Sequence, residues 1–111
     1  MINIIVPSRY KINRKLTRAF AQQTLEQMSA KNPFDLNLVF VGKNKMRMIS
    51  QRYKNENVAL PVLSFYYPDQ QLGEIIICYP QAVLLAAQRN KTVDQTLIQL
   101  LKHGITNLVR R

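Results

Sequence analysis

The feature that most constrains the fold is the alternation of two hydrophobic periodicities along the chain. Apolar residues recur every two positions in a strand and every three or four in a helix, so the local pattern separates the two. The sequence predicts the order β-α-β-α-β-β-α-α. This order indicates an α+β fold, in which a small mixed four-stranded sheet has its helices packed mainly on one face.

Four segments are rich in β-branched and other apolar residues, which favour strands. They are Ile2 to Val6, Phe34 to Val41, Val62 to Tyr67 and Leu72 to Cys78. Turn residues separate the last two segments, so we expect these to pair as a hairpin.

Four other segments repeat their apolar residues at helical spacing. We expect helices from Ile12 to Ala30, ended by Lys31 to Pro33, from Lys43 to Lys54, from Pro80 to Arg89, and after Thr92. Thr92 and Gln95 have the spacing of a capping box, which predicts the start of the last helix.

The length of 111 residues predicts one domain, and the hydrophobic share of 47% is that of an ordinary globular protein. No segment approaches the roughly 18 consecutive apolar residues of a membrane span, so we expect a cytoplasmic protein without a membrane partner. The lone Cys78 lies in an apolar run, which favours a buried side chain.

The charge is strongly one-sided, with 16 Lys and Arg against 6 Asp and Glu and a formal net charge of +10. This excess favours a polyanionic partner, and charge alone leaves RNA, DNA and an anionic membrane open. One basic cluster comprises Arg9, Lys11, Arg14, Lys15 and Arg18, and the other comprises Lys43, Lys45, Arg47, Arg52 and Lys54.

We take the second cluster as the candidate RNA-binding set. Tyr53, Tyr66 and Tyr67 lie close to it in sequence and can stack on unpaired bases. Tyr53 also lies on the apolar face of its helix, which favours a place in the core.

Three segments, in this order, resemble the YbeY family of metal-dependent endoribonucleases, which act on single-stranded RNA in rRNA maturation. They are Leu36 to Gly42, then Tyr53 through Val62 to Phe65 with Leu72 to Cys78 after it, and Leu100 to Gly104. The resemblance implies a YbeY-like domain over residues 1–111, metal-assisted cleavage of RNA, and rRNA or the ribosome as partner.

The resemblance also implies a zinc ion held by three histidines, of which His103 stands at the first position. The second position, four residues on, is Asn107, and residues 1–111 end before the third. Residues at i and i+4 share a helical face, but an amide oxygen is a poor zinc ligand. We therefore expect zinc to be weakly bound or absent in this chain.

The family's phosphate-contacting residue follows a tyrosine, so the resemblance gives Lys54 this catalytic role. Lys54 keeps the positive charge but lacks the planar fork of an arginine. Two alternatives to the endoribonuclease stay open. One is an RNA- or ribosome-binding protein that has lost the metal site and its activity, and the other is a piece of a complete enzyme.

Overall fold

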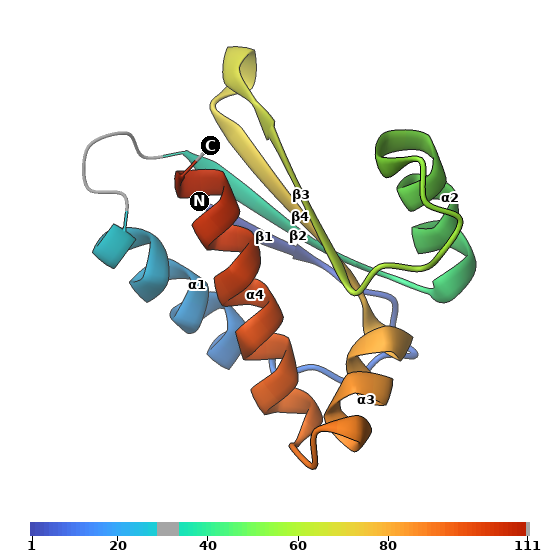
Figure 1. The fold of residues 1–111 in the computed structure, drawn as a ribbon. Helices are drawn as coiled ribbons and strands as arrows, with labels where there is room; N and C mark the ends of the chain where they lie inside the picture. Colours follow the sequence, from blue (N-terminus) through green and yellow to red (C-terminus); the bar gives the residue numbers. More distant parts are fainter. Residues whose placement is uncertain (29–33, 111) are drawn as a thin grey trace.

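The computed structural model describes residues 1–28 and 34–110, and it confirms the expected order of elements (Figure 1). The strands are β1 (Ile2–Ile5), β2 (Asp35–Val41), β3 (Val62–Tyr67) and β4 (Leu72–Cys78). The helices are α1 (Arg14–Met28), α2 (Lys43–Lys54), α3 (Tyr79–Gln88) and α4 (Val93–Val109). A 3-10 turn, η1 (Pro68–Gln70), joins β3 to β4.

Helix α1 begins two residues later than the sequence predicts. The side-chain oxygen of Asn13 accepts a hydrogen bond from the backbone N–H of Leu16 at 2.9 Å. Asparagine is among the preferred N-cap residues, because its side chain satisfies a free N–H of the first turn. The expected end of this helix, at residues 31–33, lies outside the described residues.

The sheet is mixed, with the strand order β1-β2-β4-β3. β1, β2 and β4 run parallel, whereas β3 pairs with β4 in the antiparallel sense as the expected hairpin. Leu38 of β2 and Ser64 of β3 both stand opposite Ile75 of β4, so these three side chains point to one face of the sheet.

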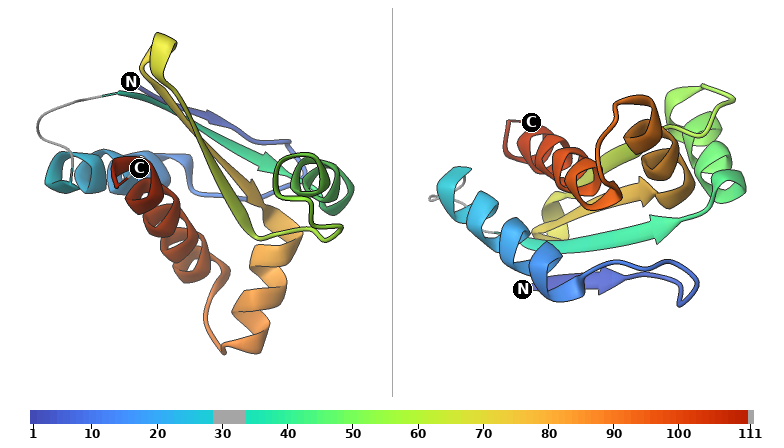
Figure 2. Two further views of the ribbon diagram at one scale, coloured as in Figure 1. Left: turned by 45° about the horizontal axis from the view of Figure 1, so that its top comes forward. Right: turned by 90° about the horizontal axis from the view of Figure 1, so that it is seen from below.

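That face, the inner face, carries the larger core, and α1, α3 and α4 pack on it (Figure 2). Its most deeply buried large side chains are Leu36, Leu38, Ile75, Ile77, Leu101 and Ile105. The expectation that helices gather mainly on one face is confirmed. Burial of so much apolar surface is the main force that holds the helices to the sheet.

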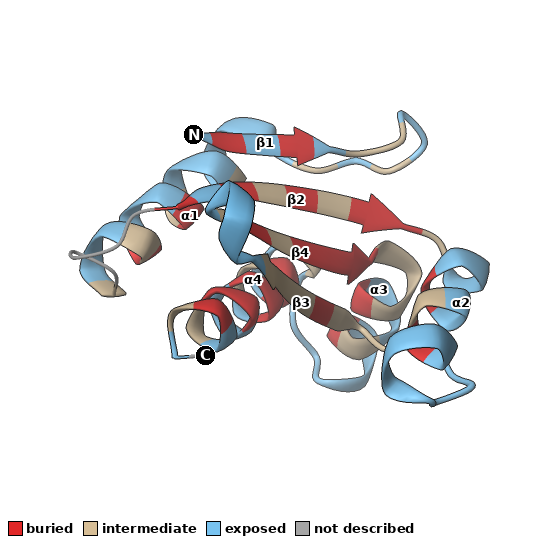
Figure 3. Cartoon of the chain, turned by 90° about the horizontal axis from the view of Figure 1, so that it is seen from above, coloured by how far each residue is buried: buried red, intermediate tan, exposed pale blue. Residues whose placement is uncertain are grey.

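Helix α2 packs on the opposite, outer face and covers only one end of it (Figure 3). Met46 of α2 is buried there against Leu63, Ile76 and Cys78. Cys78 is buried as the sequence predicts, and this burial raises the pKa of its thiol.

Helix α4 starts at the expected capping box. Thr92 Oγ1 accepts from the backbone N–H of Gln95 at 3.1 Å, and Gln95 Oε1 accepts from the backbone N–H of Thr92 at 3.0 Å. In the described part of the chain, none of the helices combines the length and the apolar character needed to span a bilayer.

Candidate active site

His103 and Asn107 lie one turn apart on the exposed side of α4. The other side of this helix is buried, from Leu97 to Leu108. The helix therefore gives positions 103 and 107 the common face that the sequence predicts, and solvent reaches both side chains.

Two contacts at Gly104 fix the position of His103 against the sheet. A Cβ atom at Gly104 would lie 2.9 Å from Ile75 Cγ2, so only glycine lets α4 approach β4 this closely. Ser64 of β3 donates its hydroxyl to the carbonyl oxygen of Gly104 at 3.2 Å. The residue next to His103 is thus held by both strands of the hairpin.

A groove, here called the His103 groove, runs beside this part of α4. It is lined by the end of the 55–61 segment, the end of α3 and the middle of α4, including Pro61, Val62, Leu85, Arg89, Lys102 and His103. Arg89 and Lys102 provide positive charge next to an imidazole. Such a set can hold a phosphate and move a proton near it.

The donor set of this groove does not fit a zinc ion. A catalytic zinc site needs about three nitrogen, sulfur or carboxylate ligands and an open position. Among the described residues, no group of three His, Cys, Asp or Glu side chains is arranged to hold a metal. Asn107, an amide, stands at the neighbouring ligand position, so His103 lacks the partners that a zinc ion needs there.

Three of the five candidate RNA-binding residues of α2 line two hollows. Lys43 and Lys45 line a wide depression with Arg9, at the carboxyl ends of β1 and β2. Lys45 and Arg52 line a second groove on the outer face of the sheet. Arg47 and Lys54 are exposed on the same helix.

Lys54, to which the resemblance gives a phosphate contact, does not line the His103 groove. Among the described residues, those that line the His103 groove include Arg89 and Lys102 but not Lys54. Helix α2 packs on the outer face, whereas α4 packs on the inner face. The two cations beside His103 therefore come from α3 and α4.

The second groove, here called the outer groove, lies between α2 and the open part of the outer face. Its lining includes Lys45, Arg52, Tyr53, Phe65, Tyr67 and Glu74. The expectation that Tyr53 lies in the core is wrong, because its side chain is 59% exposed.

Tyr66 does not line the outer groove with Tyr53 and Tyr67. It stands opposite Gly73 and points to the inner face, where its ring meets Phe34 edge-on with 5.6 Å between centroids. Adjacent strand residues point to opposite faces, so Tyr67 and Tyr66 cannot serve the same surface.

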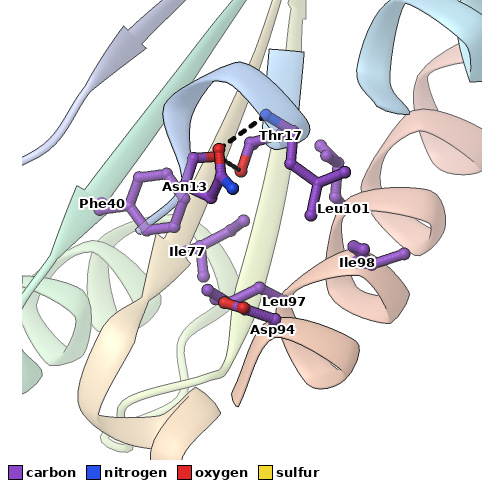
Figure 4. A pocket seen from close by; sticks show the side chains of 9 residues that line it. Asn13, Thr17, Phe40, Ile77, Asp94, Leu97, Ile98 and Leu101 are labelled. Atoms are coloured by element: carbon purple, nitrogen blue, oxygen red, sulfur yellow. Dashed lines mark hydrogen bonds between the residues drawn. The ribbon is translucent and has the colours of Figure 1, made fainter. Parts of the chain in front are cut away.

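A fourth hollow, between α1, α4 and the inner face, is too small for a ligand (Figure 4). Its volume is about 10 Å³, which is no more than the room of one water molecule. Leu97, Leu101 and Ile77 line it, together with the Asn13 cap of α1. It is a gap in side-chain packing.

Comparison with known proteins shows the family. The sequence matches the family model described as "Endoribonuclease YbeY" over residues 6–109, which span α1 to α4 and His103. The chain belongs to the YbeY endoribonuclease family. The resemblance seen in the three sequence segments is thereby confirmed.

Relatives named "Endoribonuclease YbeY" include one from Dehalococcoides mccartyi strain CBDB1, 30% identical over 97% of this chain and 78% of the relative. Another, from Thermodesulfovibrio yellowstonii, is 37% identical over 77% of this chain and 58% of the relative. The fold is also that of the solution structure of TM1509 from Thermotoga maritima, with a TM-score of 0.62, 22% identity, and coverage of 98% of this chain and 72% of that one.

Sequence reasoning did not select Arg89 or Lys102 in this YbeY-family chain. Lys102 could have been found, because it precedes His103 directly. Arg89 lines the groove because α3 and α4 are joined by a short turn and pack against each other. A short connection between two expected helices does predict such a pair, so this signal was present.

Proposed function

We propose that this chain is an endoribonuclease that cuts single-stranded RNA, with rRNA as its substrate and the cytoplasm as its location. The family match over residues 6–109 carries the proposal. The relatives named above all bear the name of an endoribonuclease. The net charge of +10 supports a polyanionic substrate.

The His103 groove is the proposed place of reaction. Cleavage of a phosphodiester requires a proton to leave the attacking oxygen and a proton to reach the leaving oxygen. The imidazole of His103 can accept and donate such protons, and it is exposed to the groove. Arg89 and Lys102 would offset the negative charge that develops on the phosphate oxygens.

The donor set of the His103 groove does not fit zinc, the cofactor that the family resemblance implies. The cleavage assay described below is therefore run with and without added Zn²⁺, and the two rates are compared. The ribosome is the proposed partner, because rRNA is the proposed substrate.

The test is cleavage of an end-labelled single-stranded rRNA fragment by the purified chain. We expect discrete products, and a rate lower by about 10²-fold or more in His103→Ala, which removes the proton-transfer group. Gln23→Ala, an exposed polar residue of α1, is the matched control and should cut like the unchanged chain.

Two results would overturn the proposal. Equal cleavage by the unchanged chain and His103→Ala would remove the reaction from the His103 groove. Tight RNA binding without cleavage, with and without Zn²⁺, would instead indicate a binding protein that does not cut.

A further inference from the structure

The outer groove lies on the opposite side of the sheet from His103. Phe65, Tyr67 and Glu74 reach it from β3 and β4, on the face that Leu63 and Ile76 also share. Gly104, next to His103, packs against Ile75 on the inner face. The outer groove is thus a separate surface, with a volume of about 310 Å³.

Aromatic rings line this groove and remain open to solvent. Tyr53 meets Phe65 edge-on, with 5.0 Å between centroids and 61° between ring planes. Tyr53 is 59% exposed and Tyr67 is 40% exposed. Unpaired bases stack on such rings, and each stacked base strengthens binding by about 1–3 kcal/mol.

Positive charge borders the rings. The guanidinium carbon of Arg52 lies 5.8 Å from the centre of the Tyr53 ring, and Lys45 lines the same groove. Helix α2 carries five Lys and Arg and no acidic residue. Among the described residues, these cations form no ion pair, so they are available to phosphates.

A single carboxylate interrupts this basic surface. Glu74 is partly buried, and its Oε1 accepts a hydrogen bond from the Tyr67 hydroxyl at 3.1 Å. An acidic group repels phosphate, but it accepts well from the exocyclic amino group of a base, as Glu does from cytosine N4. The groove therefore combines a stacking ring, flanking cations and an acceptor for a base edge.

We propose that the outer groove binds one unpaired RNA base that carries an exocyclic amino group. The base would stack at Tyr53 with its amino edge toward Glu74, while the adjoining phosphates contact Lys45 and Arg52. Uracil lacks an amino group, so the groove should prefer cytosine to uracil. This inference rests on the proposed function in one respect, which is that the ligand is RNA.

The test measures binding of fluorescently labelled oligocytidylate and oligouridylate by anisotropy, with His103→Ala as the parent chain so that the probes stay intact. The parent should bind the cytosine probe about tenfold more tightly, as expected for one hydrogen bond to a charged acceptor. Tyr53→Leu should weaken binding of both probes about tenfold, through loss of stacking.

Two further variants separate the base edge from the phosphates. Glu74→Gln should bring the cytosine-to-uracil ratio near one, because an amide can both donate and accept. Lys45→Gln should lower the slope of log affinity against log salt by about 0.7, the value for one phosphate on single-stranded RNA. Lys15→Gln, an exposed lysine of α1, is the matched control and should leave the slope nearly unchanged.

Equal affinity of the parent for both probes, or unchanged binding in folded Tyr53→Leu and Glu74→Gln, would overturn the inference. Unchanged RNA binding in these two variants would indicate that the exposed rings contact a protein partner instead of RNA. These outcomes do not depend on cleavage. Cutting by the unchanged chain with no effect of the groove variants defeats only the inference, and base-selective binding without cutting defeats only the proposed function.

Discussion

The hydroxyl of Ser64 donates to the carbonyl oxygen of Gly104 at 3.2 Å, and this bond ties β3 to α4 beside His103. We expect Ser64→Ala to lower the free energy of unfolding by about 1 kcal/mol, the usual contribution of one such hydrogen bond. Urea unfolding followed by circular dichroism measures this change. Ser8→Ala, an exposed serine, is the control. Equal stability of Ser64→Ala and the unchanged chain would show that this bond contributes nothing.

A second prediction concerns the close approach of α4 to β4. Alanine is a better helix former than glycine by about 1 kcal/mol. In Gly104→Ala, however, the added Cβ would lie 2.9 Å from Ile75 Cγ2 in the core. Overpacking of this kind costs about 1–3 kcal/mol, so we expect a net loss of stability of about 1 kcal/mol.

Thermal unfolding of Gly104→Ala, Ile75→Val and the double variant tests the contact itself. Valine keeps Cγ2 but lacks Cδ1, which would lie 3.0 Å from the added Cβ, so part of the clash is relieved and the double variant should lose less stability than the sum of the single losses. Strict additivity would contradict the steric account.

The third prediction concerns the titration of Tyr67. Burial, together with the charge and the hydrogen bond of Glu74, raises the pKa of Tyr67 above its ordinary value. Because the folded chain holds this proton more tightly than the unfolded chain, the associated stability is present below the ordinary tyrosine pKa. It is lost as the pH rises through the raised pKa.

Glu74→Gln should lower the pKa of Tyr67 but leave the effect of burial, so the return to the ordinary value should be partial. Absorbance of the phenolate, taken as a difference from Tyr67→Phe in each background, isolates this residue from the other tyrosines. If the pKa of Tyr67 is the same with and without the Glu74 carboxylate, then Glu74 does not contribute to raising it.

The fourth prediction concerns zinc. His103 alone is a weak site, so the unchanged chain should lose zinc on dialysis, whereas Asn107→His places two imidazoles on one helical face and should retain more. Metal analysis after dialysis gives the readout, and Asp94→His, an exposed position of α4 nine residues before His103 and therefore without the i+4 spacing, is the control. Stoichiometric zinc in the unchanged chain would overturn the expectation.

Hydrophobic periodicity predicted the helices and strands well where the apolar residues of the pattern are the ones buried in the structure. The bounds of Lys43–Lys54, Val62–Tyr67 and Leu72–Cys78 were predicted as observed, because each begins or ends at a turn residue or a change of period. The start of α1 was missed because the Asn13 cap was not recognised, although asparagine is a known N-cap residue.

The candidate site was harder to predict, because it depends on which face each element presents. The exposed face of His103 follows from helical spacing alone. The absence of Lys54 from the lining of the His103 groove does not, since it depends on α2 packing on the outer face. The exposure of Tyr53 also depends on how little of that face α2 covers.

Helix α4 is made after all four strands, yet it supplies Leu97, Leu101 and Ile105 to the main core. During synthesis on the ribosome, the part of the inner face that α4 covers therefore stays open until α4 has left the exit tunnel. The nascent chain must keep its apolar strands from aggregating over that interval, and folding can complete only after translation of α4.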